Sequence, residues 1–327
     1  MHFVRSGWMF RGLRIPISPW QLARRTASEV MKDDVLGMAG QLAYFFVLAL
    51  FPALIFFVSL VAYLPGDMPQ QLVASLQPLL PATVVTIVRE QIDAITRAEP
   101  KGLLTFGLLV AIWSSSAALI ATTSTLNRAY DISEARPWWK VRLIAILLTL
   151  ILATVVIVAL GLLILGPLLA GKMGSWFGFG PAFVTVWSMA RWPIIFMLVS
   201  FGIALVYYYA PDADQEWIWI TPGSILATLL WIGASLGLQA YLRIAGTFTE
   251  TYGALGGAIV LLLWLYVSGI AILVGGELNA EIEHASPQGK APGEKKPGQR
   301  RRLYAFARNV QGEPLEVPDG RKEDRST

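Results

Sequence analysis

Six long stretches of this 327-residue chain contain no charged side chain. They are Val35–Gly66, Gly102–Asn127, Leu143–Gly171, Trp192–Pro211, Trp217–Leu242 and Thr251–Gly276. A helix of about 20 apolar residues crosses the hydrocarbon core of a bilayer, and each stretch reaches that length. Only 15% of the residues are charged, whereas soluble domains average about 25%. The sequence therefore predicts an all-α, polytopic membrane protein and excludes a soluble enzyme.

The uncharged stretches divide the chain into three parts. Residues 1–34 form a basic segment with an amphipathic pattern, which predicts a helix lying on the cytoplasmic membrane surface. Residues 35–283 form the membrane domain, in which a long amphipathic loop, residues 65–101, is expected on the outer side. Residues 284–327 are rich in proline, glycine and basic residues and are expected to be a disordered cytoplasmic tail. The six predicted transmembrane helices fall at about residues 38–64, 103–126, 144–168, 193–209, 219–242 and 255–280.

The distribution of lysine and arginine predicts the orientation. These residues concentrate in the cytoplasmic segments of membrane proteins. With six spans, 20 of the 26 basic residues fall on the side that carries both termini and 6 fall on the other side. The loop at 212–216 is acidic instead of basic, but acidic residues contribute little to orientation. Both termini of this multi-pass membrane protein are therefore predicted to be cytoplasmic.

The composition restricts the chemistry that the chain can carry out. It has no cysteine, and its two histidines, His2 and His284, lie outside the predicted spans. Thiolate metal sites, disulfides and cysteine nucleophiles are thus absent. The acidic residues are scattered, and we find no catalytic constellation of the kind that hydrolytic enzymes use. We therefore expect no enzymatic activity, no metal site and no cofactor.

Several residues are expected to shape or pack the helices. Pro52 lies inside the first span, where proline removes a backbone donor and can kink the helix. Gly233 and Gly237 form one GxxxG motif, and Gly253 and Gly257 form another. Small residues at this spacing allow two helix backbones to approach closely. Packing inside the bundle is the preferred interpretation of both motifs, although a homo-oligomer is compatible with them.

Ordered motifs connect the chain to a known family. They are Gly40-Gln-Leu-Ala-Tyr44 with Phe51-Pro52, Leu126-Asn-Arg-Ala-Tyr130 with Arg136-Pro-Trp138, Tyr209-Ala-Pro211, Thr221-Pro-Gly223 with Trp231, and Tyr252-Gly-Ala-Leu-Gly256 through Trp264-Leu-Tyr266 to Glu277-Leu-Asn-Ala280. In this order they resemble the YihY/virulence factor BrkB family of bacterial inner-membrane proteins, over about residues 20–283. The resemblance implies six membrane helices. The family has also carried a ribonuclease BN label, for which this sequence offers no chemical support.

Polar residues near the cytoplasmic ends of the spans are the candidate functional residues, because polar groups within a membrane are costly. Glu277 is the strongest case, and it lies roughly 33 Å along the last span. We expect it to pair with Arg128 or another arginine of the same rim. Solvated residues at a helix end are the alternative interpretation. The full candidate set is Gln41, Tyr44, Arg128, Asp131, Glu277, Asn279 and Glu281.

Three functions are compatible with this pattern. The first is transport or translocation of a lipid-like or amphiphilic envelope molecule. The alternative is a structural or regulatory membrane subunit without transport activity, and a membrane enzyme is the least supported. The expected partners are membrane lipids and envelope proteins. No nucleic acid is expected, because no folded surface of basic and aromatic residues is visible.

Overall fold

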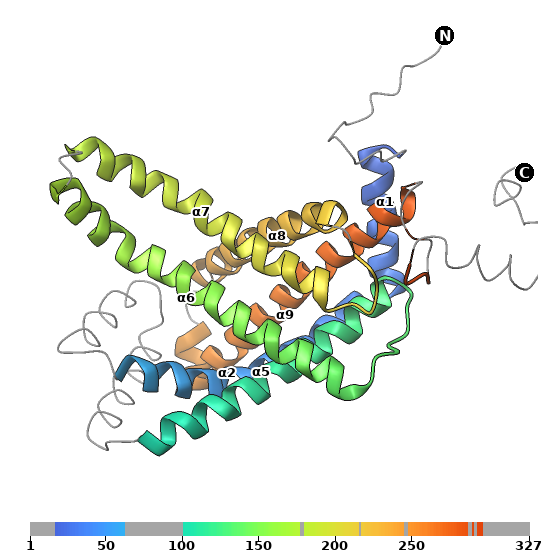
Figure 1. Ribbon diagram of the computed structural model, residues 1–327, viewed down its shortest axis with the longest axis horizontal. Coiled ribbons are helices and arrows are strands. Elements are labelled where there is room, and N and C mark those ends of the chain that lie inside the picture. The colour runs from blue at the N-terminus through green and yellow to red at the C-terminus, as the bar shows by residue number, and fades with distance from the viewer. Residues whose placement is uncertain are drawn as a thin grey trace, which may run out of the picture.

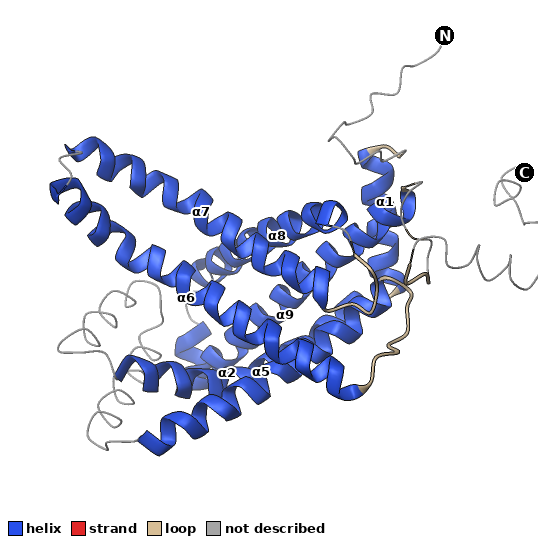
Figure 2. Cartoon of the chain, in the orientation of Figure 1, coloured by secondary structure: helices blue, strands red, loops and turns tan. Residues whose placement is uncertain are grey.

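The computed structural model describes residues 17–62, 101–176, 180–215, 217–244, 248–286, 290 and 293–296, and in these residues all regular secondary structure is helical (Figures 1 and 2). The predicted outer loop therefore lies mostly outside the described residues. The helices are α1 (Pro19–Lys32), α2 (Val35–Ala62), α5 (Lys101–Ala129), α6 (Trp138–Trp176), α7 (Gly180–Tyr209), α8 (Trp217–Ile244) and α9 (Phe248–Ala285).

Helix α1 is a separate amphipathic helix joined to α2 by a sharp bend. Ser18 caps its first turn: the Ser18 hydroxyl accepts a hydrogen bond from the Gln21 amide, and the Gln21 side chain accepts one from the Ser18 amide. This reciprocal pair satisfies two amides that have no partner within the helix. Asp34 follows α1 with a φ of 54°, and the axes of α1 and α2 meet there at 65°.

Five described helices are long and apolar enough to cross a membrane, and the count is six if the bent pair of α1 and α2 forms one span. The five segments are Leu108–Ala129, Trp138–Leu163, Phe183–Tyr209, Thr221–Leu242 and Gly256–Ala285. Each overlaps a predicted span, and α2 continues through Pro52 as one helix. The largest boundary difference is at residues 169–192, predicted as a loop. The structure extends α6 to Trp176 and begins α7 at Gly180.

The helices pack as neighbours in the chain and across it. Helix α8 lies against α9, α2 against α5, and α6 against α7, while α9 also contacts α2, α1 and α5. Helices α6 and α7 extend together beyond the other helices (Figure 1). One apolar cluster joins α5, α6, α7 and α8, and a second joins α2 to α9. Large apolar side chains such as Met197 and Leu236 remain exposed on the flanks, as is expected of surfaces that face lipid.

Helices α8 and α9 approach each other closely at Gly223 and Gly275. A Cβ atom added at Gly275 would lie 2.5 Å from the Gly223 carbonyl oxygen and 2.8 Å from the Ala227 Cβ. Only glycine fits between these two backbones. The packing predicted for the GxxxG motifs is wrong at the three described positions. Gly233, Gly237 and Gly257 are exposed, and no atom lies within 4 Å of a Cβ added there. Gly253 lies outside the residues whose surroundings are described.

Candidate functional site

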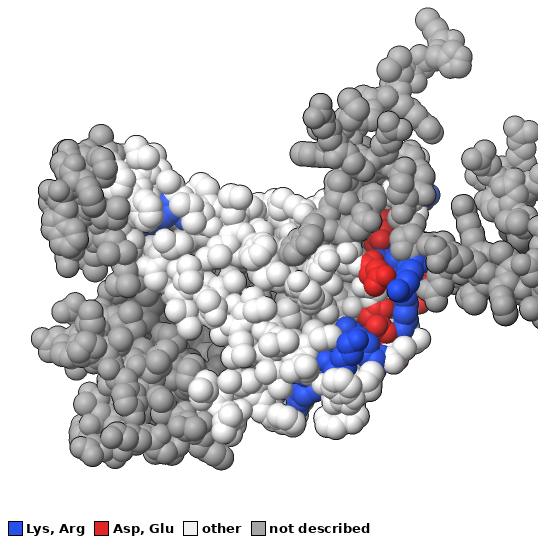
Figure 3. Space-filling model, viewed as in Figure 1, with Lys and Arg blue, Asp and Glu red and all other residues white. Residues whose placement is uncertain are grey.

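The charged side chains visible in Figure 3 gather mainly at one end of the molecule. We call this region the charged end. It is built from the α1–α2 bend, the end of α5 with the loop to α6, the turn between α7 and α8, and the end of α9 with the segment after it. Its principal residues are Asp33, Arg128, Asp131, Glu134, Arg136, Asp212, Glu277, Glu283, Lys290 and Lys295.

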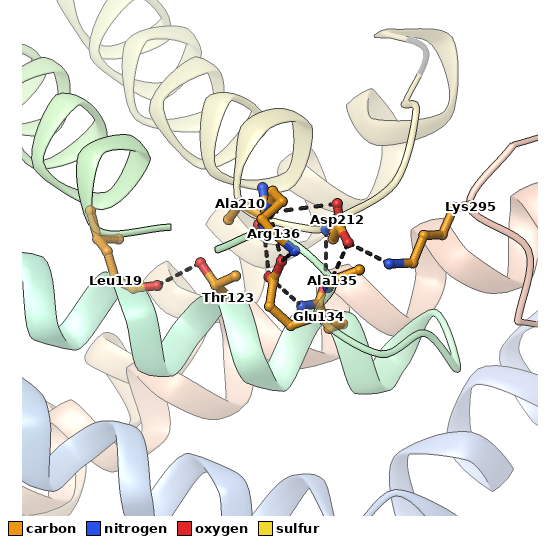
Figure 4. Close-up of polar contacts among 9 residues, drawn as sticks. Leu119, Thr123, Glu134, Ala135, Arg136, Ala210, Asp212 and Lys295 are labelled. Atoms are coloured by element: carbon orange, nitrogen blue, oxygen red, sulfur yellow. Dashed lines mark hydrogen bonds and ion pairs between the residues drawn. The ribbon is translucent and has the colours of Figure 1, made fainter. Parts of the chain in front are cut away.

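A group of ion pairs joins three separate segments at the charged end (Figure 4). Arg136, in the loop before α6, lies 2.7 Å from the Glu134 carboxylate and donates to the Ala210 carbonyl at 2.7 Å. Its Nε also lies 3.5 Å from Asp212 in the turn after α7. Asp212 accepts from the Ala135 amide at 3.0 Å and from Lys295, which follows α9. The acidic turn at 212–216 therefore has a structural role that the sequence did not reveal.

The carboxyl group of Glu134 is stabilised in its charged form. Partial burial disfavours ionisation, but hydrogen bonds from Arg136 and Asn127 outweigh this effect and hold the pKa of Glu134 at about 2. The Asn127 amide donates at 3.0 Å, and the Arg136 Nε donates at 2.8 Å. The same contacts raise the pKa of Arg136. Both groups are therefore charged over the whole physiological pH range.

We expect acid to weaken the ion pair between Glu134 and Arg136 and so to destabilise the charged end. The folded-state pKa of Glu134 is about 2, below its ordinary value of 4.5. Its contribution to stability is thus fully present above pH 4.5 and is lost as the pH falls towards 2. Thermal unfolding of the purified protein between neutral pH and about pH 3 should show a smaller acid-induced decrease in Tm for Glu134→Gln than for the wild type. Parallel curves for the two proteins would contradict this role.

The segment after α9 folds back onto the bundle. The Asp214 amide donates to the Lys295 carbonyl at 2.9 Å, and the Gly293 amide donates to the Tyr130 carbonyl at 3.3 Å. Lys290 is only 1% exposed and pairs with Glu283 at 3.0 Å. A tail disordered from residue 284 was expected, but the described residues up to 296 belong structurally to the membrane domain. The tail's remaining residues, 287–289, 291–292 and 297–327, lie outside the described part.

Asn279 is the predicted site residue with the clearest structural role. It is completely buried, and its Oδ1 accepts a hydrogen bond from the Gly223 amide at 2.7 Å. Pro222 interrupts the hydrogen-bond ladder of α8 at this point. The hydrogen bond from Gly223 to Asn279 therefore satisfies the backbone amide next to Pro222. It lies where α8 and α9 approach each other closely. Two of the motifs in the sequence, Thr221-Pro-Gly223 and Glu277-Leu-Asn-Ala280, meet through this contact.

Glu277 is buried, so the alternative of a solvated residue at a helix end does not hold, and it does not pair as predicted. Its side chain is 1% exposed, and no described residue forms a hydrogen bond or ion pair with its Oε1. Arg128 is exposed and acts electrostatically on Asp33. The predicted Glu277–Arg128 pair is therefore wrong, because Arg128 lies exposed near the end of α5 and forms no ion pair with Glu277. The strongest electrostatic influences on Glu277 come from acidic side chains: Asp33, Glu29, Glu281 and Asp131.

The other candidate residues lie around Glu277 without forming one cluster. Glu281 is half-buried one helical turn further along α9, and Asp131 is exposed after α5 with a φ of 55°. Gln41 and Tyr44 are exposed on α2, and the Tyr44 ring packs edge-on against Phe45. The structure thus brings Asp131 and Glu281 near Glu277 and leaves Gln41 and Tyr44 on the outer surface of α2.

An open pocket of about 610 Å³ lies beside the end of α5. We call it the α5 pocket. Charged and hydroxyl side chains line part of it, including Asp33, Arg128, Asp131 and Ser124. Ile120 and Val141 contribute apolar surface. The hydroxyl of Thr123, which also lines it, donates to the Leu119 carbonyl of its own helix at 2.9 Å (Figure 4). Asp33 was not among the predicted site residues, although an acidic pair at positions 33 and 34 directly precedes the first uncharged stretch.

A second open pocket, of about 490 Å³, lies between the beginning of α6 and the end of α7. Arg136, Lys140, Tyr209 and Lys295 are among its lining residues. Neither pocket has the donor set of a metal centre. Within the described ranges, no group of three or more His, Cys, Asp or Glu side chains could hold a metal ion.

Comparison with known proteins gives consistent matches. The family model described as virulence factor BrkB matches residues 26–300. The chain is 35% identical over 242 residues to the "Putative ribonuclease-like protein YfkH" of Bacillus subtilis (strain 168). The aligned region covers 74% of this chain and 88% of that protein. It is 28% identical to a UPF0761 membrane protein of Verminephrobacter eiseniae (strain EF01-2), over 81% of this chain and 63% of the relative. A UPF0761 membrane protein of Tolumonas auensis (strain DSM 9187 / NBRC 110442 / TA 4) is 26% identical, over 77% and 82% respectively. No solved structure matches the chain.

Proposed function

The chain belongs to the virulence factor BrkB family of multi-pass membrane proteins, and from this we propose that it translocates a lipid-like or amphiphilic envelope molecule. In this proposal six helices span the bacterial inner membrane, with α1 and α2 contributing one bent span. The charged end faces the cytoplasm together with both termini, because 20 of the 26 basic residues fall on that side. Membrane lipids are the first expected partners, and envelope proteins are the second.

The observation that supports translocation best is the mixed lining of the α5 pocket. Charged and hydroxyl side chains, among them Arg128, Asp131 and Ser124, line it together with apolar Ile120 and Val141. A pocket of this kind suits a molecule with a polar head and an apolar body, since each part meets surface of its own polarity. Its volume of about 610 Å³ lies within the range of about 300–1,000 Å³ typical of sites for small ligands.

The pocket also has an apolar surface beside it along which an amphiphile can approach. Leu109 and Trp113 on α5 and Leu143 and Leu147 on α6 are all exposed. Arg142 lies at the same surface, with its guanidinium 3.7 Å from the centre of the Trp113 ring and a hydrogen bond to Ser116 at 3.1 Å. A molecule that keeps its apolar part in the lipid can therefore reach the polar lining without crossing an aqueous phase.

The test is to fill the pocket. Ser124 is exposed within it, so Ser124→Trp should occupy much of its space while leaving the helix intact. Wild-type protein reconstituted in liposomes should move a fluorescently labelled phospholipid between leaflets faster than empty liposomes do. The Ser124→Trp variant should lose roughly tenfold of that rate, which corresponds to about 1.4 kcal/mol in the barrier.

The matched control is Leu229→Trp, at an exposed position of α8 that lines neither pocket. It should translocate at the wild-type rate. Equal rates in empty and protein-containing liposomes, across phospholipids of different head groups, would overturn the transport proposal. They would favour the structural or regulatory subunit instead. We propose no enzymatic activity, so the same preparations should leave added RNA uncleaved.

A further inference from the structure

Glu277 lies between two apolar clusters on one face of α9. Leu273, one turn before it, packs against Val35 and Met38 at the start of α2. Ala280, three residues after it, packs against Tyr130 and Ile132 beyond the end of α5. Residues spaced by three or four positions share a helix face. The carboxyl group of Glu277 is therefore held in the apolar contact between α9, the start of α2 and the end of α5.

This carboxyl group has no positive partner in the part of the chain that the structure describes. No lysine or arginine forms an ion pair with it there, and its Oε1 is buried without a hydrogen-bond donor. Glu283, on the same helix, shows the contrast: it is equally buried but pairs with Lys290 at 3.0 Å. A carboxylate removed from water is strongly destabilised unless a positive charge neutralises it. Among the described residues, Glu283 therefore has a positive partner and Glu277 has none.

The surroundings of Glu277 favour positive ions. On α1 and the bend after it, Glu29 and Asp33 act on it, and beyond α5 so does Asp131. Asp33 and Asp131 also line the α5 pocket. With Glu134, three carboxylates and one guanidinium, that of Arg128, line this pocket. An excess of carboxylates in a cleft favours the approach of cations.

We propose that Glu277 binds a monovalent cation, either a proton or an alkali metal ion, which reaches it through the α5 pocket. One buried carboxylate requires one positive charge. A divalent ion bound by this one carboxylate would leave a net positive charge buried in an apolar contact, which is costly. The step is reversible association: the ion leaves its water shell, is bound by the Glu277 oxygens, and returns to water unchanged. This proposal does not depend on the transport activity proposed above.

Other charged and titratable groups surround Glu277, and the test must separate its effect from theirs. Positive groups are present nearby but are directed elsewhere: Lys32 pairs with Glu29 at 2.7 Å, and Arg128 is exposed. On α7, the Tyr207 hydroxyl donates to the Ile272 carbonyl at 2.5 Å. The full set to be considered is Arg25, Glu29 and Lys32 on α1, Asp33 at the bend, Arg128, Tyr130 and Asp131 at the end of α5, Tyr207 on α7, Glu281, Glu283 and His284 on α9, and Lys290 after it.

Thermal unfolding of the full-length protein in detergent tests the proposal, because an ion that binds only the folded state raises Tm with its concentration. One arm varies pH in choline chloride, and the other varies sodium or potassium chloride at constant pH and constant total chloride. We expect Tm to rise with one of these cations. The arm that responds identifies a proton or an alkali metal ion. Glu277→Gln, which keeps the shape of the side chain without its charge, should lose the cation-dependent part of the shift.

The matched control is Glu281→Gln, one turn away on α9, which should keep the shift. Wild-type protein whose Tm responds to neither cation would overturn the proposal, and so would a Glu277→Gln variant with the full wild-type response. If Glu277→Gln does not fold, infrared difference spectra of the wild type with and without the responding cation replace it. A change in the band of a buried carboxyl group is then expected, and an unchanged spectrum would overturn the proposal. Loss of lipid transport with an intact cation response would count against the proposed function alone.

Discussion

Gly223→Ala should lower the stability of the protein by about 1–3 kcal/mol, the usual effect of overpacking a close contact. The Gly223 Cα faces the Gly275 backbone and the Asn279 side chain, and an added methyl group would collide with both. The Gly275 backbone is part of α9 and cannot move on its own. The Asn279 side chain is held in place because its Oδ1 accepts a hydrogen bond from the Gly223 amide at 2.7 Å. The variant therefore separates α8 from α9 or breaks this hydrogen bond. The measurement is Tm of the purified protein in detergent.

Gly233→Ala is the matched control on the same helix. Nothing lies within 4 Å of a Cβ added at Gly233, and alanine is favoured over glycine inside a helix by up to about 1 kcal/mol. This variant should match the wild type or exceed its Tm. If Gly223→Ala were as stable as Gly233→Ala, the close crossing of α8 and α9 at this point would be wrong.

The contrast between these two glycines shows what the sequence could predict about the bundle. Charge-free stretches locate the spans well, because the thickness of the bilayer core sets the number of apolar residues that a membrane helix needs. A GxxxG motif, in contrast, marks a helix face that is able to pack closely without stating which helix meets it. Gly223 and Gly275 have no such spacing, since they lie on different helices. Their contact depends on the crossing of α8 and α9, which no local pattern encodes.

The candidate site was predicted to a similar extent. A glutamate at the end of an apolar span is costly, and this general argument selected Glu277 as a candidate functional residue, with a solvated helix end as the alternative. In the structure its side chain is 1% exposed. The prediction that Arg128 would be its partner was wrong, because helical periodicity does not show which way the chain turns at the end of α5. Asn279 was selected for its polarity alone, and its bond to the Gly223 amide emerged only from the packing of two helices. Asp33 was overlooked because it lies at a bend whose direction the sequence does not show.

Residues after α9 show the opposite error, in which composition predicted disorder for a segment that is partly docked. Proline, glycine and lysine are typical of disordered tails, and these residue types surround Lys290. Yet Lys290 lies over the Tyr130 ring, with its Nζ 5.6 Å from the ring centre, and donates to the Asp214 carbonyl at 2.5 Å. Its partners come from the α5–α6 loop, the α7–α8 turn and α9. Only the folded bundle brings these three segments together.

Lys290→Met should therefore destabilise the protein strongly, by about 3–5 kcal/mol, as expected when one partner of a buried ion pair is removed. Lys290 and Glu283 have side chains only 1% and 3% exposed. The substitution keeps a long apolar side chain but leaves the Glu283 carboxylate buried beside it without this positive charge. We expect a large decrease in Tm in detergent and faster proteolysis of the segment after α9, because the contact that holds this segment to the bundle is lost.

Two further variants separate the buried charge from the mere presence of a lysine. Lys296→Met removes an ion pair with Asp214 in which the side chains are 72% and 67% exposed, and exposed pairs contribute little, so Tm should hardly change. The double variant Lys290→Met with Glu283→Gln also removes the carboxylate that has lost its lysine, and it should recover part of the lost stability. A Lys290→Met protein as stable as Lys296→Met would show that the segment after α9 is not held by the buried pair. The segment would then be held by its other contacts, among them the Lys295–Asp212 ion pair and the hydrogen bond from the Gly293 amide to the Tyr130 carbonyl.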